Sequence, residues 1–75
     1  MSTLQRFNDS RVVMYFDDHP PPHVHVKLRD GRDGIVDLNS FEIQGRVAAR
    51  EIREALDWIR ARQSVLLEQW HRNHA

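Results

Sequence analysis

Strict alternation of polar and apolar residues from His23 to Arg29 is the feature that most limits the folds open to this chain. Successive side chains of a strand point to opposite faces, so Val24, Val26 and Leu28 are expected to share a buried face. The polar residues of the run then share the other face: His23, His25, Lys27 and Arg29. Pro20-Pro21-Pro22 precedes the run and lacks backbone donors, so regular structure is interrupted there. The sequence therefore predicts a half-buried strand that starts sharply at His23.

Three further segments have the composition of strands and predict a meander. Residues 3–7 and 11–16 flank Asn8-Asp9-Ser10, whose side chains favour a turn. Residues 34–38 follow the hairpin signal Asp30-Gly31 and place Val36 and Leu38 inward. We expect an antiparallel four-stranded sheet with strands at about residues 3–7, 11–16, 23–29 and 34–38.

Beyond Gly45 the apolar residues recur at intervals of three and four, which is the period of a helix. They are Ala48, Ile52, Ala55, Leu56, Ile59, Leu66, Leu67 and Trp70, with Gln63 as the interruption. The pattern predicts one helix over about residues 46–72, which at 1.5 Å per residue is about 40 Å long. The whole chain, residues 1–75, then forms a single α+β domain with the sheet packed against this helix.

A helix of that length exceeds what a small sheet covers. Its last turns, which carry Leu66, Leu67 and Trp70, are therefore expected to overhang the domain. An exposed apolar stripe favours binding to a small partner protein or self-association through the helix. Trp70 is expected in the core or in that interface, and Trp58 half exposed. His71 and His74 are expected to be tail residues.

Charge and composition exclude several classes of function. Lys plus Arg and Asp plus Glu each number 11, so the net charge is zero with neutral histidines. A general nucleic-acid ligand or an anionic membrane surface is therefore not expected. The chain has no cysteine, which excludes disulfides and cysteine-based zinc sites. It shows neither an apolar signal region nor a stretch that spans a bilayer, so we expect a cytoplasmic protein.

The segment from His19 to His25 predicts a candidate metal site. His23 and His25 lie two residues apart on one strand, so their imidazoles share a face at a backbone spacing of about 7 Å. This spacing suits two ligands of one divalent transition metal such as zinc. His19, Asp17 or Asp18 supplies a third ligand, and water completes an open site of the catalytic type.

Two other interpretations of these histidines stay open. A neutral and a protonated imidazole that flank a phosphodiester act as general base and general acid, with Tyr15 or Lys27 stabilising the developing charge. This would be a small ribonuclease-like mechanism with His23 and His25 as catalytic residues. Alternatively the histidines are structural, with His25 bonded to a backbone carbonyl or to a carboxylate such as that of Asp37.

The string Pro21-Pro22-His23-Val24-His25-Val26 resembles the central motif of a small bacterial family, domain of unknown function 4160. The motif corresponds to His19 and the run from Pro21 to His25, and the resemblance extends over nearly the whole chain to Trp70. It implies a small cytosolic protein that is often encoded beside another small protein, as in toxin–antitoxin pairs. The leading hypothesis is thus a non-enzymatic interaction module of a two-gene pair, and the alternative is the histidine-centred metal or ribonuclease-like site.

Overall fold

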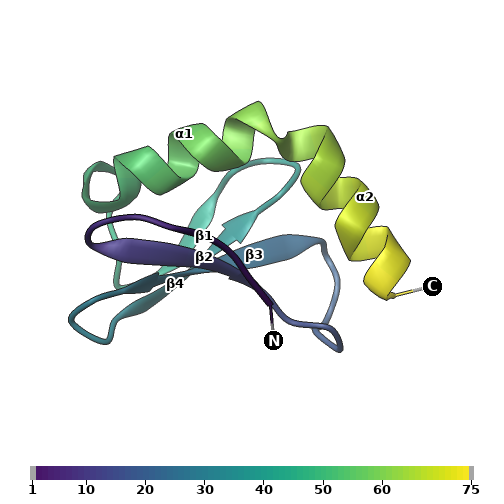
Figure 1. Ribbon diagram of the computed structural model, residues 1–75, viewed down its shortest axis with the longest axis horizontal. Helices are drawn as coiled ribbons and strands as arrows, with labels where there is room; N and C mark the ends of the chain where they lie inside the picture. The colour runs from purple at the N-terminus through teal and green to yellow at the C-terminus, as the bar shows by residue number, and fades with distance from the viewer. Residues whose placement is uncertain (1, 75) are drawn as a thin grey trace.

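An antiparallel meander sheet forms one layer of the computed structural model, which describes residues 2–74 (Figure 1). Its five strands follow one another in chain order: β1 (Ser2–Arg6), β2 (Ser10–Met14), β3 (His23–Leu28), β4 (Asp33–Asp37) and β5 (Ile43–Gly45). The second layer is helical and lies across one face of the sheet (Figure 1). The α+β class and the antiparallel meander agree with the prediction, whereas the sheet has one strand more than expected.

The predicted alternation along β3 is confirmed. Val24 and Val26 are fully buried, and they join Val12 and Val36 of the neighbouring strands in the core. The helices contribute to the same core with Ile52, Ala55, Leu56 and Ile59. Removing a side chain of this size from water stabilises a fold by about 1.5–3 kcal/mol, so the shared face determines which side of the sheet the helices cover.

The prediction of a single helix over residues 46–72 is wrong. The segment consists of a short 3-10 turn, η1 (Ala49–Ile52), followed by α1 (Arg53–Ala61) and α2 (Gln63–Asn73). Arg62 separates the two α-helices with φ −119° and ψ 22°, outside helical values. α2 therefore turns down past the end of the sheet instead of continuing along α1 (Figure 1). None of these helices, within residues 2–74, has the length and apolar character needed to cross a bilayer.

Gln63 explains the polar interruption in the apolar stripe. Its side-chain Nε2 donates to the carbonyl oxygen of Leu38 at 2.8 Å, which anchors the start of α2 to the end of β4. Beyond that anchor, Leu66 and Trp70 are only 2% and 3% exposed and belong to the core. Leu67 is partly buried against the same core. The overhanging stripe is therefore absent, because the bend at Arg62 returns these side chains to their own domain.

The missed fifth strand follows a turn closed by the Asp37 side chain. Asp37 Oδ1 accepts the backbone N–H groups of Asn39 and Ser40 at 2.7 and 2.9 Å. Phe41 adopts φ +62°, a left-handed conformation that glycine and asparagine favour, so its sequence gives no turn signal. Gly45 ends β5 at φ +113°, and a Cβ there would lie 2.7 Å from the carbonyl oxygen of Asp33.

An ion-pair network joins the β3–β4 hairpin to the start of the helices. Arg32 donates from Nη1 and Nη2 to the two carboxylate oxygens of Glu51 at 3.1 and 2.7 Å, and its Nε donates to Asp30 at 2.9 Å. Glu51 also accepts the backbone N–H of Ala48 at 2.9 Å. The Arg32 guanidinium, and secondly this N–H, lower the pKa of Glu51 from 4.5 to about 2.

Acid is therefore expected to destabilise the protein partly through Glu51. Its folded-state pKa lies below its unfolded value, so its stabilising contribution is complete above pH 4.5 and is lost as pH falls towards 2. Thermal unfolding followed by circular dichroism between pH 6 and pH 2 should show a shallower acid decline for Glu51→Gln than for the wild type. Glu54→Gln, an exposed change in the next helical turn, is the control and should keep the wild-type decline. Equal slopes for Glu51→Gln and the wild type would contradict the assignment.

Candidate metal centre

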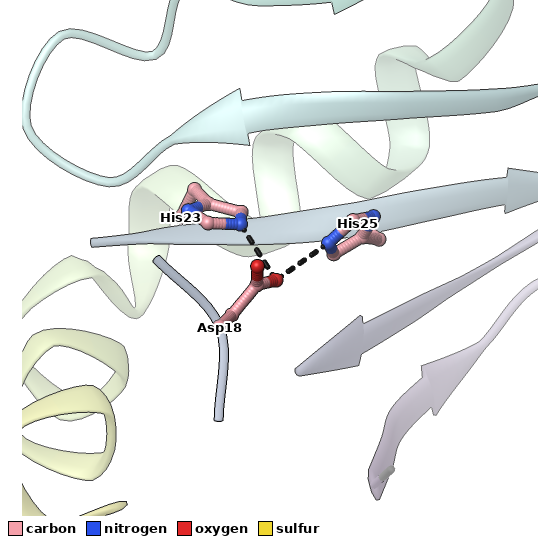
Figure 2. Close-up of side chains that lie close together, drawn as sticks. All are labelled: Asp18, His23 and His25. Carbon is pink, nitrogen blue, oxygen red and sulfur yellow. Dashed lines mark hydrogen bonds and ion pairs between the residues drawn. The ribbon is translucent and has the colours of Figure 1, made fainter. Parts of the chain in front are cut away.

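The loop between β2 and β3 brings one carboxylate against two imidazoles of β3 (Figure 2). Asp18 Oδ2 lies 2.8 Å from His23 Nε2 and 2.9 Å from His25 Nε2. One potential ligand atom from each of these three residues lies within 4.8 Å of the others. The two histidines share a face because they are i and i+2 on the strand, and the loop supplies the third group.

Prolines and backbone contacts define the path of this loop. The Pro20–Pro21 peptide bond is cis, and the Pro22 carbonyl accepts the backbone N–H of Leu38 at 2.9 Å. The backbone N–H of His19 donates to Asp18 Oδ1 at 3.0 Å, which leaves Oδ2 facing the imidazoles. The carboxylate is thus oriented by its own loop.

His23 is held in a single tautomer when it is neutral. His23 is 8% exposed, and its ring packs against the indole of Trp70 with 5.0 Å between ring centroids. Nδ1 lies 2.7 Å from the Pro21 carbonyl oxygen. A carbonyl only accepts hydrogen bonds, so Nδ1 carries the proton. Nε2 of the neutral ring would then offer its lone pair to a metal ion beside Asp18, whereas the hydrogen bond to the ionised Asp18 needs a proton on Nε2 as well.

His25 is arranged in a similar way. Its Nδ1 is buried without a hydrogen-bond partner among the described residues, and it lies 3.6 Å from Asp33 Oδ1. With its proton on Nδ1, the ring would offer the Nε2 lone pair to a metal ion beside Asp18, whereas without a metal ion Nε2 donates to Asp18 Oδ2 at 2.9 Å. The edge-on ring of Tyr15, 4.6 Å away between centroids, fixes the orientation of the imidazole.

The carboxylate of Asp18 is ionised in this setting. Burial alone raises its pKa, but hydrogen bonds from His25, from His23 and from the His19 N–H together outweigh burial and hold the pKa below its usual 3.8. Asp18 Oδ2 and the Nε2 atoms of His23 and His25 therefore converge on one region. In the absence of a cation, both Nε2 atoms hydrogen-bond Asp18 Oδ2, and the buried Nδ1 of His25 has no hydrogen-bond partner among the described residues. A divalent metal ion satisfies all three groups together.

Solvent reaches this group from two sides. A surface hollow of about 270 Å³ borders Asp18 and His23, and another of about 610 Å³ borders Asp18 and His25. The carboxylate lies between them. An ion held here would keep coordination positions open to water or to a small ligand, as catalytic metal sites do.

The sequence matches the family described as domain of unknown function DUF4160 over residues 10–71. The chain belongs to this family. No curated protein and no solved structure matches the chain significantly. The match covers most of the DUF4160 protein and includes the whole candidate metal centre, from Asp18 to His25.

The DUF4160 structure brings together two of the three histidines named from the sequence. His23 and His25 meet as expected, and Asp18 is the third group. The ring of His19 is not part of this cluster, and His19 and Asp17 are exposed. The loop turns at Asp18, so only that one of the three candidate third ligands points at the strand. Asp37 does not bond His25, because its carboxylate caps the turn before β5.

Tyr15 and Lys27 lie at the rim of the candidate metal centre. Lys27 Nζ is 3.2 Å from Asp33 Oδ2 and 5.7 Å from the centroid of the Tyr15 ring. Tyr15, and secondly Asp33, raise the pKa of Lys27 above its usual value. Lys27 therefore stays cationic and is suited to hold an anion near the site.

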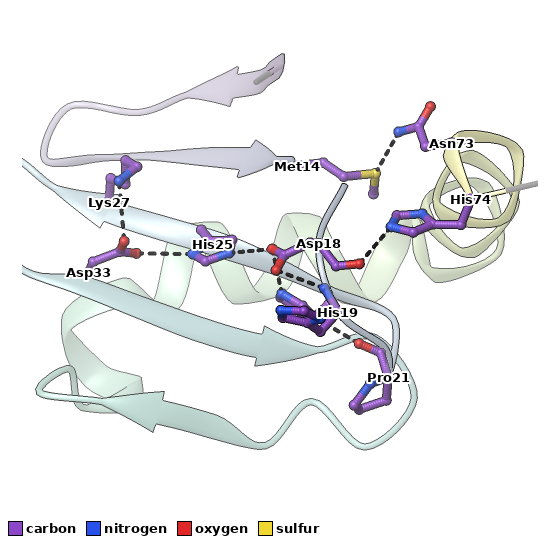
Figure 3. Close-up of polar contacts among 10 residues, drawn as sticks. Met14, Asp18, His19, Pro21, His25, Lys27, Asp33, Asn73 and His74 are labelled. Atoms are coloured by element: carbon purple, nitrogen blue, oxygen red, sulfur yellow. Dashed lines mark hydrogen bonds and ion pairs between the residues drawn. The ribbon is translucent and has the colours of Figure 1, made fainter. Parts of the chain in front are cut away.

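His74 contributes to the site although the sequence placed it in the tail. Its Nδ1 lies 2.7 Å from the Trp70 carbonyl and its Nε2 lies 2.9 Å from the Asp18 carbonyl (Figure 3). Both partners are backbone carbonyls, so each ring nitrogen faces an acceptor and the ring bridges α2 and the β2–β3 loop. The ring also stacks on Trp70 at 3.9 Å. Nothing in the local pattern indicates this contact, because it depends on the bend at Arg62.

Proposed function

We propose that this DUF4160 protein binds one divalent transition metal ion through Asp18, His23 and His25. The observation that carries the proposal is the orientation of the two imidazoles. Both Nε2 atoms contact the same carboxylate oxygen of Asp18, His23 Nδ1 bonds the Pro21 carbonyl, and His25 Nδ1 lies 3.6 Å from the Asp33 carboxylate without a hydrogen bond. Metal-binding histidines in proteins donate their second N–H to a carbonyl or carboxylate, as His23 does here.

Two imidazoles and one carboxylate suit zinc, iron or nickel, and they leave positions for water. A metal ion in such a site polarises a bound oxygen and activates water near neutral pH. This chemistry fits the geometry better than a metal-free acid–base pair. Both ring nitrogens of His23 already face protein groups, so His23 has no nitrogen left to exchange a proton with a substrate.

A second proposal concerns a partner protein. With Leu66 and Trp70 inside the core, the large apolar side chains that stay exposed among residues 2–74 are Phe16 and Val65, at 51% and 63%. They support at most a small contact for the product of a neighbouring gene, as in a bacterial toxin–antitoxin-like pair. Co-purification with that product tests this proposal, and a complex that survives Phe16→Ser combined with Val65→Ser would contradict it.

Metal titration tests the main proposal directly. Protein freed of metal by chelation and dialysis is titrated with Co²⁺ by absorbance and with Zn²⁺ by calorimetry. We expect one ion per wild-type chain. His25→Ala should weaken binding by at least about 100-fold, since a lost ligand costs more than the roughly 10–100-fold effect of an outer-shell partner.

His19→Ala is the matched control because it removes an imidazole of the same loop that lies outside the cluster. It should retain the wild-type affinity. Absence of stoichiometric cobalt and zinc binding by the wild type, or an equal loss in both variants, would refute the metal centre and leave Asp18 as a structural anchor.

A further inference from the structure

Three basic residues stand side by side across the sheet on the face that carries the candidate metal centre. Arg6 of β1 is directly opposite Arg11 of β2, and Arg11 is directly opposite Lys27 of β3. Directly opposed residues of antiparallel strands project from the same face. Lys27 follows His25 by two residues, so this basic row and the imidazole lie on one face.

The basic row lines a hollow between the β1–β2 and β3–β4 turns. The hollow has a volume of about 480 Å³, and Arg29 adds a fourth cation to its wall. Asp9 is the single acidic residue in its lining. The chain as a whole is neutral, so this end of the sheet is a local concentration of positive charge.

The arginines of this hollow form no ion pair among the described residues, as is also true of Arg50 and Arg53 on the helical surface. Within residues 2–74, no carboxylate lies within ion-pair distance of Arg6, Arg11 or Arg29. Arg32, by contrast, is bound to both Asp30 and Glu51. A guanidinium with free donors offers a planar fork that matches two oxygens of a phosphate. Arg6, Arg11 and Arg29 repel one another with Asp9 as the one acidic residue in the lining, and an anionic ligand relieves this repulsion.

The distance to the metal centre suits one small ligand. Lys27 and His25 are separated by about 7 Å along β3. Figure 3 shows the continuous line of side chains from Lys27 through Asp33 and His25 to Asp18. If the phosphate of a ligand occupies the basic hollow, the adjoining part of the same ligand can therefore reach the metal ion.

We propose that the basic hollow binds a phosphate group of the ligand that the metal centre acts on, and that this ligand is a phosphate ester. This inference rests on the proposed metal site, which would bind the part of the ligand beyond the phosphate. The hollow holds about one or two phosphates rather than a long duplex, because its lining carries four basic residues in a chain without net charge. A mononucleotide and a short single strand of RNA are both phosphate esters, and the experiment distinguishes between them.

Fluorescence anisotropy with a labelled single-stranded RNA tetranucleotide tests the basic hollow, with adenosine monophosphate and inorganic phosphate as competitors. Arg6→Gln combined with Arg11→Gln should weaken binding at least about tenfold, since charge-assisted bonds to two guanidinium groups are lost. Arg50→Gln combined with Arg53→Gln removes the same charge from the exposed helical surface and should leave affinity within about twofold. Two phosphate contacts predict a salt slope of about −1.4.

Zinc is the second arm of the experiment. It should strengthen binding of the RNA by the wild type and should not do so for His25→Ala. Displacement of the RNA by adenosine monophosphate identifies a small ester as sufficient, whereas displacement only by unlabelled RNA identifies the strand; either result supports the phosphate site. Three results would overturn the phosphate site and leave the metal centre standing. They are non-saturable RNA binding, equal losses of affinity in the two double variants, and RNA binding that does not respond to zinc in a protein that binds zinc. Arginine-dependent binding in a protein that takes up no metal would instead overturn the metal centre.

Discussion

Trp70→Ala is expected to destabilise the protein by about 3–5 kcal/mol, the cost of removing a large buried aromatic side chain. Trp70 is 3% exposed and packs in the core, against the His23 ring at 5.0 Å and under the His74 ring at 3.9 Å. A domain of 75 residues has few other large contacts, and stabilities of such domains are near the lower end of about 5–15 kcal/mol. Urea unfolding followed by far-ultraviolet circular dichroism should show a midpoint shifted to much lower denaturant.

Trp58→Ala is the matched control for this change. Trp58 is partly exposed, and the Arg62 guanidinium lies 4.9 Å from its ring centroid. Its removal should cost about 1 kcal/mol, from a cation–π contact and a limited buried area. Similar midpoints for the two variants would show that α2 does not pack on the sheet, and the bend at Arg62 would then be wrong.

Asp18→Asn is expected to remove most of the stabilisation that metal gives to the folded protein. The substitution keeps the shape of the side chain and removes the charge of the carboxylate that contacts both His23 and His25. An ion at 1,000 times its dissociation constant stabilises the folded state by about 4 kcal/mol, provided that it does not bind the unfolded chain. A loss of at least about 100-fold in affinity removes about 2.7 kcal/mol of this. Thermal unfolding with and without zinc measures the difference.

Asp17→Asn provides the comparison for this variant, because Asp17 is adjacent and exposed. It should keep the full rise in melting temperature with zinc. A wild type whose melting temperature ignores zinc, together with a strongly destabilised Asp18→Asn, would show that Asp18 serves the structure by anchoring its loop to β3.

Four of the five strands and the buried faces could be predicted from the sequence because they depend on local periodicity. The alternation from His23 to Arg29 places Val24 and Val26 in the core and the two imidazoles together, whatever the rest of the chain does. The pairing of hairpin turns with β-branched runs likewise predicted the meander. The period-three-and-four stripe also identified the side chains that the helices bury, including Trp70.

Other features depended on contacts between segments distant in the sequence. The bend at Arg62 has no proline or glycine; it forms because Gln63 reaches the Leu38 carbonyl and Leu66 and Trp70 gain burial. The turn at Phe41 is similarly held by Asp37 and not by a residue that prefers its backbone angle.

The candidate metal centre, too, could be predicted from the sequence only in part. The spacing of His23 and His25 was sufficient to place two imidazoles on one face, because strand geometry is local. Three other features could not be predicted without the strand register and the path of the loop. They are the choice of Asp18 over His19, the contact of His74 with the Asp18 carbonyl, and the basic row of Arg6, Arg11 and Lys27. Periodicity tells which side chains of one element share a face, and only the packed structure tells which other element comes to meet them.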